Sequence, residues 1–500
     1  MPANSGQPLW TRASVFALAS LAAAAVLRFA FLVRKPFWFD ECFSVEVARL
    51  SWRDFGLLLW RREANMSLYY LLLRGWLHFG SSPFFIRSLS VIISLASLPA
   101  IYWLAGKLFD RRVALLAAAL IGCNAYHIRY AQEARSYSLF VLLATLSSGF
   151  FVALLQSPSR ENRGGYILAS VLGCYAHLYA MLLVAAQWLS VRRWDRTQEL
   201  VRFRPLSRAW IWIGVASLPL VIFAAKTGAG PIRWIQRPRL HEVVEFAEHL
   251  CGNDGIVLAL LYVAACMAAI MPLGKVRRMF RPDIGWDVWR LRFLLTWLIF
   301  PVALVVLLSL ARPLFLGRYF IFCLPAMVIL AAAGIARLGR PWVIAASLAT
   351  MLALSVQGTF SYYDHDFDLE RDGSEAAMNY ILDQAQPGDA ILFHIAEARV
   401  PYEFFRSLRA SHGGTSGPEI IYPRHGDHLD YRDFTGKPTV EFLQSVPAHH
   451  SRVWVVLMSN GSPGHPDATT ELLNQALGGR FPHVEEAKFT QVEVRLYSKP

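Results

Sequence analysis

The chain has 500 residues, of which 55% are apolar and 17% are charged, and its mean hydropathy is +0.36. A soluble chain of this size would not normally show a positive mean hydropathy, so the composition excludes a single soluble domain. The net charge of +13 divides into +21 for residues 1–360 and −8 for residues 361–500. Because the positive residues lie in loops between apolar runs, the basic excess indicates membrane topology, and no nucleic-acid partner is expected.

Eleven apolar runs predict membrane-spanning helices, since several of them reach the roughly 20 residues that cross a bilayer core. The first could be mistaken for a signal peptide but is long for one, so it is interpreted as an anchor. The runs at 164–176 and 178–191 are short for complete spans and are interpreted either as one broken excursion or as two tilted helices. The eleven runs are residues 13–33, 83–106, 111–128, 136–156, 164–176, 178–191, 209–225, 254–273, 291–311, 317–337 and 341–359.

The loops between the apolar runs alternate between arginine-rich loops and loops that are not rich in arginine, and this alternation predicts the orientation of the chain in the membrane. By the positive-inside rule the arginine-rich connections are cytoplasmic, which places the amino terminus inside. Eleven spans then carry the carboxyl terminus to the outer face of a plasma (inner) membrane. The outward-facing loops are residues 34–82, 124–135, 226–253 and 312–316.

The tail from about residue 361 is polar, is punctuated by glycine and proline, and contains no run long enough to span a membrane. Helical and strand-like segments alternate in it, which predicts a three-layer α/β domain. Helices are expected at 374–385, 402–408, 439–446 and 468–477, and strands at 390–394, 419–422, 452–458, 485–490 and 492–498. The fold class is therefore a polytopic α-helical membrane protein, with a transmembrane domain at 1–360 and an extracytoplasmic α/β domain at 361–500.

The first outer loop carries an adjacent pair of carboxylates, Asp40 and Glu41, among aromatic residues. A carboxylate in such a partly desolvated place is suited to act as a general base. The alternative is structural: Asp40 caps the amino terminus of a helix, and Glu41 and Glu46 interact with the helix dipole. The spacing alone favours neither interpretation.

The second outer loop, residues 127–137, combines two arginines, a carboxylate and a histidine. This density suits binding of a polyanion and a hydroxylated ligand. In the alternative interpretation, Arg129 and Arg135 extend to lipid headgroups and Glu133 pairs with one of them. Arg318 and Tyr319 stand at the outer end of the tenth run, where a single arginine is usually a lipid anchor.

Several short motifs together resemble the C-type (GT-C) membrane glycosyltransferases, nearest to the branch of protein O-mannosyltransferases and lipid A aminoarabinose transferases. They are Trp-x-Asp-Glu after the first run, Leu-Tyr-Tyr-Leu-Leu-Leu and Phe-x-x-Arg before the second, His-x-x-Tyr-x-Gln-Glu-Ala-Arg-x-Tyr after the third, and a late Arg-Tyr. The resemblance covers roughly residues 30–340.

This resemblance implies inverting transfer of a sugar from a polyprenyl-phosphate carrier to an acceptor at the outer face. It implies that Asp40 is the catalytic base. The surroundings of acceptor and donor would include Glu41, Glu133, Tyr137 and Tyr69, and the donor phosphate would be bound by Arg135, Arg318 and Tyr319. The expected partners are the polyprenyl-phosphate sugar, membrane lipid, and a glycan, lipid or protein acceptor.

Two local features depart from the family pattern or fit it only in part. Many relatives have His-Pro-Pro before the paired tyrosines, whereas this chain has Asn65, Met66 and Ser67, which leaves the class of acceptor open. His177 resembles a family position, but a histidine that caps a helix end is the favoured interpretation.

Two patterns resemble metal sites, and neither has a full ligand set. His241 and Glu245 fall short of a zinc motif because the second histidine is a glutamate, so an amphipathic helix is expected. The acidic run from Asp364 to Glu375 lacks the glycine of a calcium loop and is interpreted as a solvated linker. No metal site is predicted and no cofactor is required, although Glu41 and Glu133 could share a divalent cation with the donor phosphate.

The sequence also allows two rival functions. A transporter or flippase would bind a lipid-linked sugar without chemistry, but it is expected to place ionisable residues within its spans and often to show repeated halves. A structural partner in an envelope assembly would use the tail as its binding module, and would leave Asp40 and the arginines of the outer loops unexplained.

Overall fold

The structure is a computed structural model that describes residues 12–191, 196–228, 235, 237–252, 255–271, 285–364, 371–411, 413–414, 417–426, 428–458, 461–462 and 465–499. The chain divides into two compact units. The membrane unit consists of Met1–Leu32, Arg62–Tyr69 and Arg87–His365, and the loop–tail unit consists of Val33–Arg61, Tyr70–Ile86 and Asp366–Pro500.

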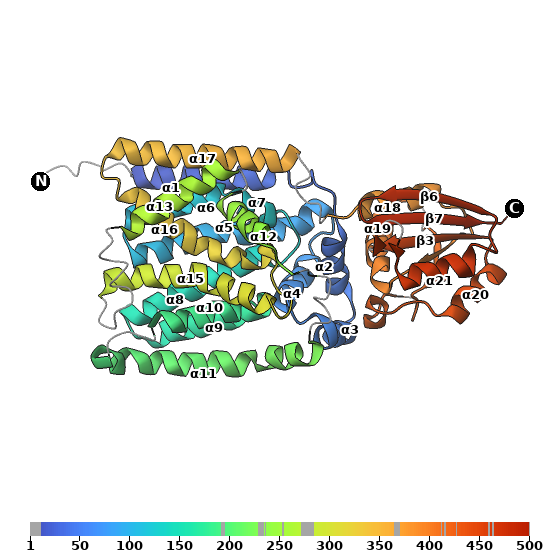
Figure 1. Cartoon of the computed structure of the whole chain (residues 1–500), viewed down its shortest axis with the longest axis horizontal. Helices are drawn as coiled ribbons and strands as arrows, with labels where there is room; N and C mark the ends of the chain where they lie inside the picture. The colour runs from blue at the N-terminus through green and yellow to red at the C-terminus, as the bar shows by residue number, and fades with distance from the viewer. Residues whose placement is uncertain are drawn as a thin grey trace, which may run out of the picture. The chain divides into compact units, whose positions relative to one another are not determined.

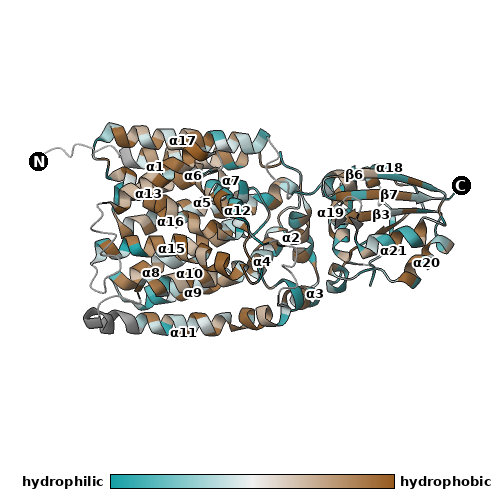
Figure 2. Cartoon of the chain, in the orientation of Figure 1, coloured by the Kyte–Doolittle hydropathy of each residue, from teal (hydrophilic) through white to brown (hydrophobic). Residues whose placement is uncertain are grey.

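All eleven predicted apolar runs form helices in the structure, and these helices make up most of the membrane unit. Figure 1 shows that they run side by side as a bundle, and Figure 2 shows many hydrophobic residues along them. They are α1 (Arg12–Phe29), α5 (Pro83–Leu108), α6 (Arg111–Cys123), α7 (Ala125–Ala131), α8 (Tyr137–Gln156), α9 (Arg160–Ala176), α10 (Ala180–Val191), α11 (Arg196–Thr227), α13 (Ile256–Ile270), α15 (Trp286–Ser309), the 3-10 helix η3 (Gly317–Cys323), α16 (Leu324–Ala336) and α17 (Pro341–Asp364).

Among the described residues, six helices are long and apolar enough to cross a membrane, or up to eight if each of two bent pairs is one span. The bent pairs are α6 with α7, at 59°, and α12 (Leu240–Cys251) with α13, at 77°. The shorter apolar helices Ser14–Phe29 and α10 add to these. The chain is therefore a multi-pass membrane protein, as predicted, and the number of eleven complete spans stays a prediction.

Close packing of the membrane unit depends on buried aromatic and small side chains. Every residue of α16 from Leu324 to Ile335 is buried. Trp297 on α15 is fully buried and donates from its indole nitrogen to the carbonyl of Phe322 at 2.9 Å. Small residues allow helices to approach closely, which is how van der Waals contact replaces the hydrophobic effect in lipid. The bundle is thus a rigid support for the loops at its ends.

The tail within the loop–tail unit is the three-layer α/β domain that the sequence predicts. Its five-stranded sheet has the order β2-β1-β3-β7-β6, in which β1 is parallel to β2 and β3, while β7 is antiparallel to β3 and β6. The strands are β1 (Ala390–Phe393), β2 (Glu419–Tyr422), β3 (Arg452–Met458), β6 (His483–Phe489) and β7 (Val492–Ser498), and β4 (Gly461–Ser462) with β5 (His465–Pro466) forms a separate ladder. The helices are α18 (Ser374–Gln384), η4 (Ala396–Ala398), α19 (Arg399–Ser411), η5 (Tyr431–Phe434), α20 (Val440–His449) and α21 (Ala468–Leu477).

The two faces of this sheet are covered by different helices because its central strands are apolar on both sides. Leu443 of α20 and Leu473 of α21 belong to the same buried cluster as Leu392 and Val455. On the other face, Tyr380 of α18 packs edge-on against Trp454, with ring centroids 6.1 Å apart. Two helical layers therefore enclose one sheet.

Most of the first outer loop, Val33–Arg61 and Tyr70–Ile86, belongs to the same unit as the tail. The loop forms α2 (Phe39–Arg49), α3 (Trp52–Leu58), the π-helix η1 (Leu59–Glu63) and α4 (Ser67–Trp76), and its segment Arg62–Tyr69 belongs to the membrane unit. Phe37 stacks on Phe404 of α19 with ring centroids 4.6 Å apart, and Phe43 of α2 meets Phe434 edge-on at 5.3 Å. The domain boundary at residue 360 remains a prediction, but the loop that carries Asp40 shares a hydrophobic core with the tail.

Candidate functional site

Asp40 and Glu41 lie in the first turn of α2, in the loop–tail unit. The cap position of this helix is occupied by Trp38, whose side chain makes no capping hydrogen bond. Asp40 is half-buried and Glu41 is fully buried. Asp40 is therefore not the cap residue of α2, and the structural alternative considered for it does not hold in that form.

The capping acceptor at the start of α2 comes from the tail. The backbone N–H of Phe39 donates to Asp372 Oδ2 at 3.3 Å, and the N–H of Phe37 donates to Glu375 Oε2 at 2.6 Å. Arg371 adds a hydrogen bond from its guanidinium to the carbonyl of Pro36 at 3.2 Å. These residues belong to a part of the chain that the sequence presented as an acidic linker. Asp372 and Glu375 instead hold the segment that leads into Asp40.

Asp372 also interacts electrostatically with Asp40. Burial raises the pKa of Asp372, hydrogen bonds from Ser374 oppose that rise, and the negative charge of Asp40 adds to it. Only 7% of Asp372 is exposed. The two carboxylates are thus close enough to influence one another. Asp366, Asp368 and Glu370, the other members of the predicted linker, lie outside the described residues.

The predicted arginines gather around His177 in the membrane unit. Arg135 follows α7 in the bend before α8, and Arg318 is the second residue of η3. Both guanidinium groups act electrostatically on the imidazole of His177. The ring of Tyr319 lies 4.9 Å from that imidazole, centroid to centroid. The second outer loop and the late Arg-Tyr pair therefore lie near the same histidine, and their role in binding a phosphate stays a prediction.

The ring of His177 accepts a hydrogen bond in this arrangement, and this assigns its neutral form. It stands at the cap position after α9, as the sequence favoured, and its Nδ1 accepts from the backbone N–H of Tyr179 at 3.2 Å. An Nδ1 that accepts carries no proton, so the proton of the ring is on Nε2. His177 is 1% exposed and its ring stacks on Phe140 at 4.9 Å, and within the described part of the chain its Nε2 has no hydrogen-bond partner.

Tyr69, Glu133 and Tyr137 are buried near the same loop. The hydroxyl of Tyr69 lies 2.8 Å from that of Ser90, and Ser90 donates to the backbone carbonyl of Arg135 at 3.4 Å. Glu133 and Tyr137 are each 1% exposed. The backbone on either side of Arg135 is therefore well packed, and its side chain extends from this support.

The segment that departs from the family pattern packs against the helix break that carries His177. Asn65 Oδ1 accepts from the backbone N–H of Leu178 at 2.9 Å, and Ser67 donates to the carbonyl of Tyr175 at 3.4 Å. Met66 between them has φ of 68°, a conformation that is uncommon for a side chain of its size. This segment therefore contacts the backbone on either side of His177.

Arg28 is a buried charge that the sequence did not reveal. Its side chain is fully buried at the end of α1 and donates to Ser94 at 2.8 Å and to the carbonyl of Gly122 at 2.7 Å, and it lies 3.0 Å from His127 Nδ1. Gln132 donates to the carbonyl of Arg28 at 2.9 Å. His127 and Gln132, two members of the loop motif, thus take part in a structural network.

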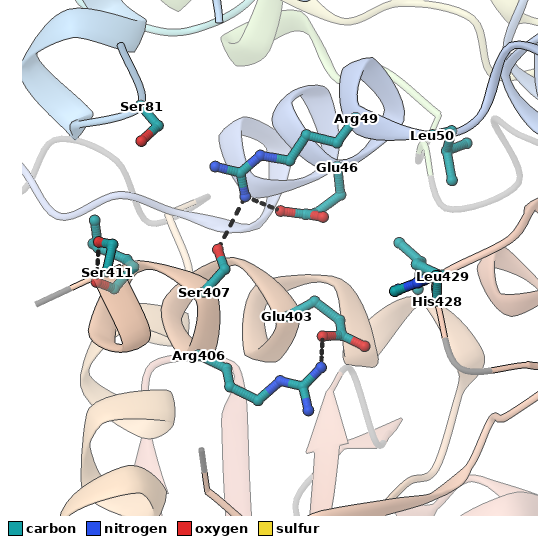
Figure 3. Close-up of a pocket in the computed structure, with 11 residues that line it drawn as sticks. Glu46, Arg49, Leu50, Ser81, Glu403, Arg406, Ser407, Ser411, His428 and Leu429 are labelled. Carbon is teal, nitrogen blue, oxygen red and sulfur yellow. Dashed lines mark hydrogen bonds and ion pairs between the residues drawn. The ribbon is translucent and has the colours of Figure 1, made fainter. Parts of the chain in front are cut away.

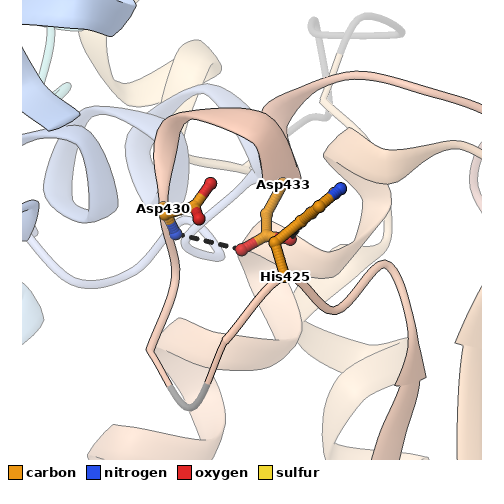
Figure 4. Close-up of side chains that lie close together, drawn as sticks. All are labelled: His425, Asp430 and Asp433. Atoms are coloured by element: carbon orange, nitrogen blue, oxygen red, sulfur yellow. Dashed lines mark hydrogen bonds and ion pairs between the residues drawn. The ribbon is translucent and has the colours of Figure 1, made fainter.

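Among the described residues, one group of histidine and carboxylate side chains has a metal-like spacing. His425, Asp430 and Asp433 offer atoms within 4.8 Å of one another, and Figure 4 shows them at one turn of the tail. Asp433 lies 2.6 Å from His425 Nδ1 and 3.4 Å from Arg399, and Asp430 caps η5 while pairing with Arg432 at 2.5 Å. Because both carboxylates already bind arginine and backbone groups, this cluster is structural.

The zinc-like pattern of the third outer loop is also structural. His241 and Glu245 lie on α12, a helix as predicted, and Glu245 pairs with His249 at 3.6 Å.

The predicted site residues fall into two groups, one in each unit. The membrane unit contains Arg135, Arg318, Tyr319 and Tyr69. Asp40 and Glu41 are grouped with the tail in the loop–tail unit.

Solved structures share this combination of a helical membrane bundle and an α/β tail along nearly the whole chain, which confirms the predicted fold class and, at the level of the fold, the resemblance. One similar structure is ArnT from Cupriavidus metallidurans in the apo state, with a TM-score of 0.64 and 13% identity over 97% of this chain and 98% of that one. ArnT bound to undecaprenyl phosphate matches with a TM-score of 0.60 at the same identity and coverage.

A more distant match extends the comparison to a second kind of enzyme. The oligosaccharyltransferase of Archaeoglobus fulgidus, tethered with an acceptor peptide, has a TM-score of 0.50 and 10% identity over 88% of this chain and 68% of that one. No protein-family model matches the sequence, and no curated protein matches it in sequence. At these identities the comparisons establish the fold alone.

Proposed function

We propose that this protein is an inverting glycosyltransferase that moves a sugar from a polyprenyl-phosphate carrier to an acceptor at the outer face of the membrane. The observation that carries the proposal is the convergence of Arg135, Arg318 and Tyr319 on the buried His177, from three separate places in the sequence. The solved structure of ArnT with undecaprenyl phosphate shares the fold and supports the choice of a lipid-phosphate donor.

The arginine group has the chemistry that a phosphate leaving group needs. Negative charge develops on the phosphate oxygens as the bond to the sugar breaks, and fixed cations that keep their protons stabilise it. Arg135 and Arg318 are such cations. The Nε2–H of His177 can add a neutral donor, and a neutral ring next to two arginines avoids the repulsion that an imidazolium would meet there.

Asp40 is the proposed base. The acceptor hydroxyl oxygen attacks the anomeric carbon, its proton passes to the Asp40 carboxylate, and the bond between that carbon and the phosphate oxygen breaks with its electron pair on the phosphate. One base and no second carboxylate nucleophile suffice for an inverting reaction. Glu41 is fully buried beside Asp40 in the first turn of α2, and we assign it to the surroundings of the acceptor.

The alternative, a transporter or flippase of a lipid-linked sugar, would use the arginine group in the same way. It gives no role to a half-buried carboxylate whose helix is capped from the tail. The two functions differ in one measurable property, since only a transferase consumes its donor.

The test is incubation of the purified protein in lipid with a panel of polyprenyl-phosphate sugars and nucleotide sugars, while donor and product are followed by mass spectrometry. The proposal expects one or more polyprenyl-phosphate sugars to be consumed with release of polyprenyl phosphate, and no nucleotide sugar to be consumed. Translocation of a lipid-linked sugar across the bilayer, with no donor consumed, would establish the transporter instead.

A further inference from the structure

The loop–tail unit contains an open cavity of about 400 Å³ that has no part in the proposed transfer reaction. It lies between α2 and α19, and Figure 3 shows Glu46 and Arg49 of α2 opposite side chains of α19. Its polar lining includes Glu46, Arg49, Glu403, Arg406, Ser407 and His428. A volume of this size lies within the range of small-molecule sites, which is about 300–1,000 Å³.

The polar groups of the lining are held in place by one another. Arg49 donates to Glu46 Oε1 at 2.7 Å and to the hydroxyl of Ser407 at 3.0 Å, which joins the two helices across the cavity. Arg406 donates to Glu403 Oε2 at 2.6 Å, while the other oxygen of Glu403 accepts from the buried Arg399 at 2.5 and 2.9 Å. A network with this many contacts keeps its donors and acceptors at fixed positions, as a binding site requires.

The lining pairs guanidinium groups with carboxyl groups, and this selects the class of ligand. Arg49 lies 2.7 Å from Glu46 on α2, and Arg406 lies 2.6 Å from Glu403 on α19. An anion would meet the carboxylates and a cation would meet the arginines, so neither gains a net attraction. A neutral polyhydroxylated molecule both donates and accepts at every hydroxyl, and it can use both kinds of group. Leucine side chains in the same wall, among them Leu408, offer apolar surface to C–H groups.

We infer that this cavity binds a neutral sugar residue of the acceptor, so that the acceptor is a glycan or a glycosylated molecule. This inference rests on the proposed function, because only a transferase has an acceptor. Glu46 follows Asp40 by six residues on the same helix, which places it about 9 Å further along the helix axis. The cavity therefore recognises a part of the acceptor remote from the reacting hydroxyl and contributes binding energy from there.

The experiment measures sugar binding directly, so it does not depend on transfer. Full-length protein in lipid nanodiscs is titrated with neutral mono- and disaccharides, with glucose 6-phosphate and with glucosamine, and binding is followed by saturation-transfer NMR. Ser407→Trp fills the cavity, and Ser445→Trp places the same side chain at an exposed serine of α20 as the matched control. Ser407→Ala removes only the hydroxyl that Arg49 contacts, and serves if the larger substitution disturbs folding.

At least one neutral sugar is expected to bind to the wild-type protein and to the Ser445→Trp variant. Binding should be lost in Ser407→Trp and weakened several-fold in Ser407→Ala. In the transfer assay with the wild-type protein, the free sugar should compete with the acceptor and raise its apparent KM. Absence of binding by every neutral sugar, a preference for the charged sugars, or unchanged binding in both Ser407 variants would overturn the inference. Failure of the proposed function would appear separately, as a lack of donor consumption by a protein that still binds sugar.

Discussion

Removal of the Asp372 carboxylate is expected to lower the rate of sugar transfer through its effect on Asp40. Asp372 accepts from the N–H of Phe39, the first residue of α2, and only 7% of it is exposed. Loss of a helix-capping acceptor costs about 0.5–2 kcal/mol. The loss falls on the turn that positions Asp40, and a misplacement of about 1 Å in a reacting group can reduce a rate by about 100-fold.

Three variants separate positioning from general destabilisation. Asp372→Ala removes the acceptor, Asp372→Asn keeps an oxygen that can accept from Phe39, and Asp383→Ala removes an exposed carboxylate of α18 in the same tail. We expect kcat to fall about 10- to 100-fold in Asp372→Ala, to recover largely in Asp372→Asn, and to be unchanged in Asp383→Ala. Donor Kd should not change in any of them.

The measurement is steady-state transfer with donor binding determined in parallel, together with thermal unfolding of each variant. A wild-type kcat in Asp372→Ala would refute the proposed positioning. Equal losses of kcat in the alanine and asparagine variants would also refute it, because the capping oxygen would then have no part in the effect.

The remaining predictions concern the phosphate site, pH and metal. Arg135→Ala and Arg318→Ala should each weaken donor binding by about 1.5–3 kcal/mol in a binding titration, the cost of a lost charge-assisted contact. Arg312→Ala, which changes an exposed arginine in the loop before η3, should leave donor binding unchanged. Wild-type donor binding in both site variants would make Arg135 and Arg318 lipid anchors. Burial raises the pKa of Glu46 from its ordinary value of 4.5 to about 7, so the contribution of Glu46 to stability is complete below pH 4.5 and is lost as the pH rises through 7. Glu46→Gln should remove this loss from melting curves taken between pH 4.5 and 8. An identical pH profile in the variant would contradict the raised pKa of Glu46. Transfer should persist in chelator, and activity that is lost there and restored by manganese or magnesium would instead indicate a metal-assisted leaving group.

The secondary structure could be predicted because its signals are local. Apolar runs of sufficient length and turn residues around short strands stand in the sequence itself, and each of the eleven runs and each tail strand has its counterpart in the structure. Helix ends were harder to predict. The helix expected at 402–408 extends to Arg399–Ser411, and Arg399 in its added first turn donates to Glu403 and to the carbonyl of Pro423, which is 24 positions away.

The candidate site could be predicted only in part, because its key contacts join distant residues. Phe39 and Asp372 are 333 positions apart, so the sequence shows an acidic linker where the structure shows a helix cap. Arg28 reads as one more positive residue at the end of an apolar run, yet it lies against His127, 99 positions away. Signals such as residue type and spacing identify candidates for chemistry, but they do not show which partner satisfies each buried charge.

The central claim is that Asp40 is the base of a transfer reaction, and the most direct measurement is sugar transfer by Asp40→Asn. This substitution keeps the size and polarity of the side chain but removes its ability to accept a proton at neutral pH. Asp54→Asn, in the same outer loop, is the control because Asp54 interacts with Ser51 at the start of α3. We predict that Asp40→Asn binds the polyprenyl-phosphate donor normally and transfers no sugar, while Asp54→Asn does both. Normal turnover by Asp40→Asn would contradict the account.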